Sequence, residues 1–119
     1  MNPVTEDPAA PYVVIERDQL TDSELEGYLV GGANVCLIFI DLAPGGGPRL
    51  HRHPYEEIFI ILEGQATFAI DSDTVEARAG QVLIAKPGVA HRFVNSGDGP
   101  LRQIDIHPND RFVTEWLES

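Results

Sequence analysis

The chain has 119 residues, 43% of them apolar, which is enough for one folded domain with a buried core and too little for two. Its 8 Lys and Arg against 19 Asp and Glu give a net charge of −11, which argues against binding nucleic acid or an anionic membrane. No apolar run approaches the roughly 20 residues that cross a bilayer, and the N-terminus lacks the features of a secretory signal. We therefore expect a soluble, cytoplasmic protein.

The N-terminal region is predicted to be a loose arm. Residues 1–11 hold three prolines among small and acidic residues, a composition that disfavours regular structure. The folded domain is therefore expected to span residues 12–119, beginning with a short β-prone piece at residues 12–15. Thr21 and Glu24 have the spacing of a capping box, which predicts one or two helical turns.

Short β-prone runs separated by turn residues dominate the rest of the chain. This pattern is typical of an all-β barrel or sandwich. Residues 111–119 carry apolar side chains at spacings of one, three and four, which predict a short C-terminal helix. The predicted strands are residues 35–42, 51–62, 66–70, 74–77, 82–85, 91–95 and 101–107.

Two of these runs are apolar on both faces. Residues 35–40 and 58–62 lack the alternation that a strand with one solvated face shows. A second copy of the chain would cover the outer face, so we predict a homodimer; the alternative is that residues 1–15 fold across the same surface. Cys36, inside the first run, is interpreted as a small buried hydrophobic residue.

A candidate metal site begins with His51, His53 and Glu57. Side chains at this spacing fall on one side of an extended strand, so two imidazoles and a carboxylate can approach one ion. His91, which follows a Pro-Gly turn, is a candidate fourth ligand from another strand. Three imidazoles and one carboxylate suit Fe, Mn, Ni, Cu or Zn as divalent ions better than Ca or Mg.

The stretches around these residues resemble the two signature motifs of the cupins. The first motif is matched by Gly45, His51, His53, Glu57 and Gly64, and the second by Gly80, Gly88, His91 and Asn95. Lys86 stands where the family usually has proline. The resemblance covers residues 35–107 and implies a small single-domain cupin, a double-sheet jelly-roll β-barrel. It also implies one divalent transition metal held by His51, His53, Glu57 and His91.

Other side chains are candidates for a substrate pocket. Arg49 shares the parity of His51 and would suit a substrate carboxylate or enolate at the rim; a solvated loop charge is the alternative. Tyr55, Phe59 and Phe93 are expected to provide apolar lining around the ion, or to be part of the core.

The last predicted strand carries two further polar residues of interest. Alternation places Gln103, Asp105 and His107 together on one face, and we expect that face to be exposed to solvent. If it points inward instead, Asp105 becomes a candidate general base or a partner of a metal ligand.

The resemblance implies several chemistries, because a fold alone does not select one. Our first hypothesis is a dioxygenase-type oxidoreductase that acts on a small organic molecule at the metal. The second is a redox-neutral isomerase or lyase in which the metal polarises a carbonyl and Glu57 or a bound water moves a proton. The third is a non-catalytic module that binds or senses a small molecule.

Overall fold

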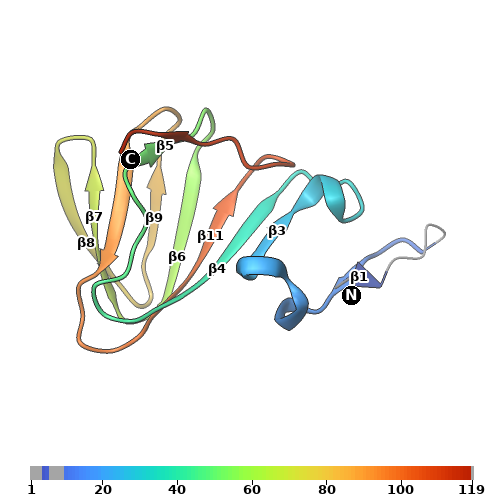
Figure 1. Ribbon diagram of the computed structural model, residues 1–119, viewed down its shortest axis with the longest axis horizontal. Helices are drawn as coiled ribbons and strands as arrows, with labels where there is room; N and C mark the ends of the chain where they lie inside the picture. Colours follow the sequence, from blue (N-terminus) through green and yellow to red (C-terminus); the bar gives the residue numbers. More distant parts are fainter. Residues whose placement is uncertain (1–3, 6–9, 119) are drawn as a thin grey trace.

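Two five-stranded antiparallel sheets face each other in the computed structural model, which describes residues 4–5 and 10–118 (Figure 1). The first sheet contains, in spatial order, β3 (Glu24–Glu26), β4 (Cys36–Leu42), β11 (Leu101–His107), β6 (Glu57–Glu63) and β9 (Val82–Ala85). The second contains β12 (Glu115–Trp116), β5 (His51–Arg52), β10 (His91–Asn95), β7 (Gln65–Ile70) and β8 (Asp73–Arg78). The predicted all-β double-sheet jelly roll is confirmed.

The core lies between the sheets and is built on aromatic rings. Phe59 of β6, Phe68 of β7 and Phe93 of β10 are buried. The ring of Phe68 lies 4.9 Å from that of Phe59 and 5.3 Å from that of Phe93. Burying one such side chain contributes about 1.5–3 kcal/mol, so these rings hold the two sheets together.

The predicted strand at residues 51–62 is two strands in different sheets. β5 ends at Arg52, and β6 begins at Glu57 in the opposite sheet. The chain therefore crosses between the sheets at Pro54 and Tyr55, since proline cannot donate to a strand ladder. This crossing lets ligands close in sequence approach one point from both sheets.

The helical turns predicted from Thr21 and Glu24 are wrong in kind. Between residues 17 and 29 the chain forms three short 3-10 turns, η1 (Arg17–Gln19), η2 (Thr21–Ser23) and η3 (Gly27–Leu29), and η2 has no side-chain cap hydrogen bond. Asp22 and Ser23 have positive φ angles of 55° and 58°, which stop a right-handed helix. Glu24 instead starts β3, because the edge of β4 offers it a partner.

The predicted C-terminal helix is also wrong. Residues 112–118 contain no helix, and within them β12 pairs with β5 through Trp116 and His51. Phe112, Thr114 and Trp116 line a cavity between the sheets, a period of two that belongs to a strand. The free edge of β5 supplied backbone partners that a helix would have left unused.

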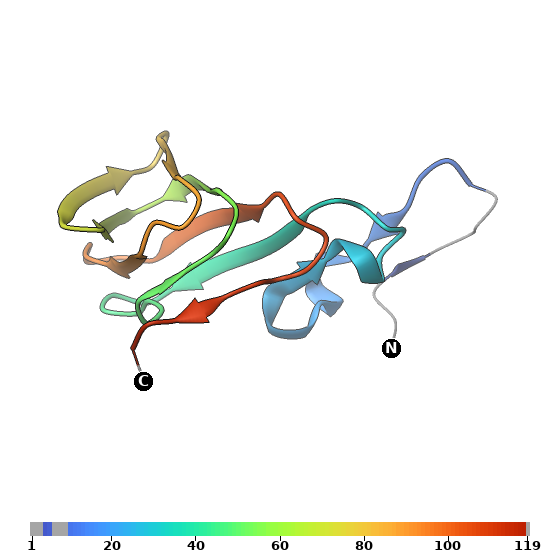
Figure 2. The same cartoon turned by 90° about the horizontal axis from the view of Figure 1, so that it is seen from above.

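The N-terminal segment lies beyond the edge of the first sheet, where β1 (Val4–Thr5) pairs with β2 (Val14–Ile15) (Figure 2). The predicted arm at residues 1–11 falls largely outside the described residues. The arm and the domain boundary after it therefore stay predictions.

Candidate metal centre

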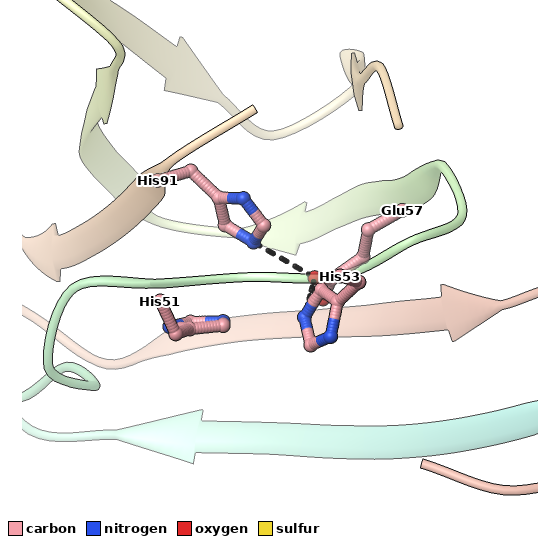
Figure 3. Close-up of side chains that lie close together, drawn as sticks. All are labelled: His51, His53, Glu57 and His91. Carbon is pink, nitrogen blue, oxygen red and sulfur yellow. Dashed lines mark hydrogen bonds and ion pairs between the residues drawn. The ribbon is translucent and has the colours of Figure 1, made fainter. Parts of the chain in front are cut away.

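The four predicted ligands lie together at one end of the space between the sheets (Figure 3). His51 comes from β5, His53 from the crossing that follows, Glu57 from the start of β6 and His91 from the start of β10. One ligand atom from each lies within 4.8 Å of every other, and all four side chains are buried. His91 sits opposite His51 in the β5–β10 ladder, which brings the second motif to the first.

Hydrogen bonds to the backbone fix which nitrogen of each predicted histidine ligand carries the proton. A carbonyl oxygen only accepts, so an Nδ1 atom bonded to one must be protonated, which leaves a lone pair on Nε2. Neutral imidazoles held this way are the form that binds metals. The accepting carbonyls belong to Arg49 for His51 (2.7 Å), Val113 for His53 (2.8 Å) and Val89 for His91 (3.0 Å).

The spacing of these atoms fits a cation. Nε2 of His53 and Nε2 of His91 lie 3.0 and 2.9 Å from Oε1 of Glu57, and dashed lines mark both contacts in Figure 3. With lone pairs on both nitrogens, the carboxylate oxygen meets two acceptors, an arrangement that needs a bound proton or a positive ion. His53 Nε2 is buried and has no hydrogen-bond partner in the part of the chain that the structure describes. The donor set is therefore suited to a divalent transition metal.

Burial and charge act in opposite directions on these groups. Burial lowers the pKa of His51 and so keeps its imidazole neutral. Burial alone would also lower the pKa of His91, but the contact with Glu57 and the Val89 carbonyl outweigh it and raise the pKa. For Glu57 burial opposes ionisation, yet His107, His53 and His91 hold its pKa well below the usual range. The carboxylate is thus ionised and ready to bind a cation.

Asp105 and His107 point inward, so their predicted exposure was wrong. Each side chain is only 2% exposed, and both line the cavity. Nε2 of His107 lies 3.1 Å from Oε2 of Glu57, so all four histidines of the chain gather here. Asp105 accepts a hydrogen bond from Gln103 at 2.7 Å. Burial, then the charge of Glu57, raises the pKa of Asp105 well above its usual value.

The cavity beside the four ligands has a volume of about 560 Å³, enough for a small organic molecule. Its wall combines polar groups with aliphatic side chains of β4. The lining residues are His51, His53, Glu57 and His107 together with others that include Glu24, Ile38, Ile40, Leu42, Phe93, Asp105, Phe112, Thr114 and Trp116.

The candidate pocket residues occupy different places. Phe93 lines the cavity, whereas Phe59 lies behind it in the core. Tyr55 is half-buried and stacks on His53, with ring centroids 5.1 Å apart. Arg49 is exposed, and its guanidinium lies 4.6 Å from the ring centroid of Trp116.

Sequence reasoning missed the contribution of the C-terminal segment. The ring of Trp116 lies 5.0 Å from that of His51, and Val113 supplies the carbonyl that orients His53. The alternation of Phe112, Thr114 and Trp116 was visible in the sequence. The apolar residues of the same segment also have the spacing of a helix, and the prediction followed that spacing.

Residues 38–107 match the protein family described as Cupin domain. The chain belongs to the cupin family. This cupin is 33% identical over 116 residues to the HTH-type transcriptional regulator PuuR of Escherichia coli K12, across 90% of this chain and 62% of PuuR. It is 36% identical over 76 residues to the polyketide synthase CurC of Streptomyces cyaneus, across 63% of this chain and 49% of CurC.

A solved structure shares the fold. The oxalate decarboxylase of Bacillus subtilis, which has Mn(II) centres, superposes with a TM-score of 0.72 at 24% identity. The match covers 79% of this cupin and 27% of that chain. The cupin thus spans less than two thirds of the length of each of these proteins. Among the described residues, no helix is long and apolar enough to cross a membrane.

Proposed function

We propose that this cupin is a metal-dependent oxidoreductase of the dioxygenase type, acting on a small organic molecule that binds beside the ion. The observation that carries the proposal is the convergence of three imidazole nitrogens and the Glu57 carboxylate beside a cavity of about 560 Å³, whose wall includes His51, His53 and Glu57. The Mn(II) centres of a protein with the same fold support the choice of a redox-active divalent metal.

The protein's own residues would hold the ion and shape the space next to it. His51, His53 and His91 would bind through Nε2, with their rings fixed by backbone carbonyls, and Glu57 would supply the anionic ligand. When bound, such a metal supplies Lewis acidity and electron transfer. Ile38 and Ile40 line the cavity and would exclude water from a bound substrate.

Metal binding is the first test. His51→Ala and His91→Ala should each lose most of the bound metal, measured by elemental analysis, and keep the circular dichroism spectrum of the parent. Arg92→Ala is the matched control, because Arg92 follows His91 on the same strand and is exposed. Full metal occupancy in either histidine variant would contradict the proposed site.

Oxygen uptake is the second test. The metal-loaded protein would be screened against small oxyacids, phenols and enediols in an oxygen electrode. Substrate-dependent oxygen consumption that is lost in His91→Ala supports a dioxygenase. Conversion of a substrate without oxygen uptake would instead favour the redox-neutral isomerase or lyase, in which Glu57 or a bound water moves the proton.

A sensing role is the second candidate function. It is favoured by the similarity to the regulator PuuR, which extends over 90% of this chain. In that case a small molecule would bind in the cavity and raise the melting temperature without being converted. Thermal-shift screening combined with product analysis separates a sensor from an enzyme.

We also propose the homodimer, supported by the outer face of the first sheet. Ile84 and Val82 of β9 are 56% and 59% exposed there. Val13 and Ile15 pack, as Leu37 does, against the cluster of Leu25 and Val30, at the other end of this face. Two apolar rows cross the sheet: Leu37, Ile106, Ile58 and Ile84 in one, and Phe39, Ile104, Ile60 and Val82 in the other.

Light scattering after size exclusion tests the dimer. Ile84→Glu should give a monomer, whereas Val75→Glu on the opposite sheet should not. A monomeric parent at micromolar concentration would defeat the proposal. The cytoplasmic location likewise remains a proposal, supported by the free, buried thiol of Cys36 and testable by cell fractionation.

A further inference from the structure

We infer that the inner face of β11 recognises the small molecule, and that this molecule presents an uncharged hydroxyl group to Asp105 and His107. The inference rests on the proposed function, because it names the class of molecule that would bind beside the ion. It selects alcohols and phenols over oxyacids. Neither of the two side chains holds the metal in the proposed function.

Three polar side chains follow one another on the inner face of β11. Gln103, Asp105 and His107 are each at most 2% exposed, and they alternate with Ile104 and Ile106 on the outer face. Asp105 and His107 line the cavity, and two residues of a strand are about 7 Å apart. Polar groups in a protein interior normally have hydrogen-bond partners, so the partners of this row show what it can still bind.

Two atoms of the row lack a partner. Nε2 of His107 and Oε1 of Gln103 are buried and form no hydrogen bond with the described residues. Nε2 of His107 lies 3.1 Å from Oε2 of Glu57, but without the geometry of a hydrogen bond. Nδ1 of the same ring is paired with the hydroxyl group of Tyr55 at 2.7 Å, whichever of the two donates. An unpaired buried polar atom is costly, so we expect a bound molecule to supply the partner at Nε2.

Asp105 is held at the cavity wall from within the same row. Its Oδ1 accepts a hydrogen bond from the side-chain amide of Gln103 at 2.7 Å. Its neighbours in the sheet are the apolar Ile38 on β4 and Phe59 on β6. Gln103 thus orients a carboxyl group that faces the cavity between apolar side chains.

The charges of the wall disfavour an ionic group at β11. The wall has the carboxyl groups of Glu24, Glu57 and Asp105, and no lysine or arginine among the residues that the structure describes. Arg49 is exposed and lies against the ring of Trp116 instead. A carboxylate on the bound molecule would therefore find no cation at β11, and a divalent ion bound nearby would repel an ammonium group.

A hydroxyl group fits this row because it both donates and accepts. It can pair with Asp105 in either protonation state and with either tautomer of His107. An ammonium group only donates, and a carbonyl oxygen only accepts. The apolar remainder of the molecule would lie against Ile38, Ile40 and Phe93, which line the same cavity.

Two probes that differ in one hydroxyl group, benzyl alcohol and toluene, test the inference. Their affinities for the Zn(II)-loaded protein are measured by NMR titration of isotope-labelled methyl groups of Ile38 and Ile40, with the outward Ile84 as a reference. The ratio of the two affinities isolates the contribution of the hydroxyl group. We expect Asp105→Leu to reduce this ratio about tenfold, the value of one hydrogen bond to a buried group.

Two further variants control for indirect effects. Asp105→Asn should keep the ratio within about threefold of the parent, because an amide also donates and accepts. Arg102→Ala should leave it unchanged, since Arg102 is exposed on the same strand. An unchanged ratio in a folded Asp105→Leu protein would overturn the inference. An equal fall in Asp105→Asn would overturn it too, because any change at this position would then disturb the cavity.

Charged probes test the class of molecule. Benzoate should bind the metal-free parent at least about tenfold more weakly than benzyl alcohol, because no cation in the wall offsets its charge. Benzyltrimethylammonium, which cannot coordinate Zn(II), should bind the loaded parent more weakly than the alcohol. Tighter binding of either ion than of the alcohol would refute an uncharged ligand.

A measurement on the parent alone avoids dependence on folding of the variants. Intermolecular nuclear Overhauser effects should connect the methylene group of benzyl alcohol to the ring of His107, and its aromatic ring to the methyl groups of Ile40. The reverse orientation would contradict the inference. A parent protein that binds no Zn(II) would defeat the proposed function, whereas the affinity ratio in the metal-free protein would still test the role of Asp105.

Discussion

Replacing Trp116 by alanine should weaken metal binding from outside the ligand set. The indole lies over His51 and under the guanidinium of Arg49, at centroid distances of 5.0 and 4.6 Å. The residue is 51% exposed, so about half of its surface is buried. It holds the segment whose Val113 carbonyl orients His53.

The magnitude follows from this burial. Half of a tryptophan surface is on the order of 100 Å², which at about 25 cal/mol per Å² contributes about 2.5 kcal/mol. The contact with Arg49 adds about 0.5–1 kcal/mol. Losing about 3 kcal/mol should release residues 112–118 and with them the partner of His53 Nδ1. Removing the partner of a metal-bound histidine typically costs about 10–100-fold in affinity.

The assay combines two measurements. Competition with a chelator gives the affinity for Zn(II), and hydrogen exchange follows the Leu117 amide, which donates to the Leu50 carbonyl at 3.0 Å. Glu115→Gln is the matched control, because its ion pair with Arg52 is exposed to solvent, which screens it and makes its contribution small.

The reasoning fails if Trp116→Ala loses protection at Leu117 but binds Zn(II) as tightly as the parent. That result would show that the segment does not support His53. Loss of affinity in Glu115→Gln of the same size would point to the backbone pairing of β12 instead of the indole.

Three further predictions concern stability. Gly64 has a φ of 86°, and a Cβ there would lie 2.4 Å from the Pro100 carbonyl oxygen; Gly64→Ala should lower the free energy of unfolding by about 2–4 kcal/mol in urea. Gly99→Ala, with nothing within 4 Å, should change it by no more than about 0.5 kcal/mol. Burial keeps Asp105 protonated in the folded state, whereas the unfolded chain releases this proton near pH 3.8. Stability therefore falls as pH rises above that value towards the folded pKa, by about 1.4 kcal/mol per pH unit. Metal-free Asp105→Asn should escape this loss, and an advantage over the parent that shrinks with rising pH would contradict the assignment. Removing metal with a chelator should lower the melting temperature by roughly 10 °C relative to metal at 100 times its dissociation constant, and no such shift is expected in His91→Ala.

The local pattern of the sequence was enough to predict most strands and the residues of the site. The bounds predicted for β9, β10 and β11 agree with the structure, because each run is flanked by turn residues that end a strand. His51, His53, Glu57 and His91 could be named together because strand parity and two turns limit where their side chains point.

The sequence did not allow us to predict which face of β11 points into the interior. Its apolar residues Ile104 and Ile106 lie on the outer face, and its polar residues Asp105 and His107 lie inside. A rule that places apolar residues inward fails here, because a cavity lined partly by polar side chains occupies the interior at this end. The apolar character of the neighbouring strands on their outer face was the available signal.

The C-terminal segment depended even more on the tertiary structure. Its spacing of apolar residues suits a helix, but the edge of β5 and the rim of the cavity offer a partner only to an extended chain. The sequence by itself determined which side chains can meet at the candidate metal centre. Only the packing of two sheets decided that Tyr55, His107 and Val113 would surround it, because those contacts join residues more than 50 positions apart.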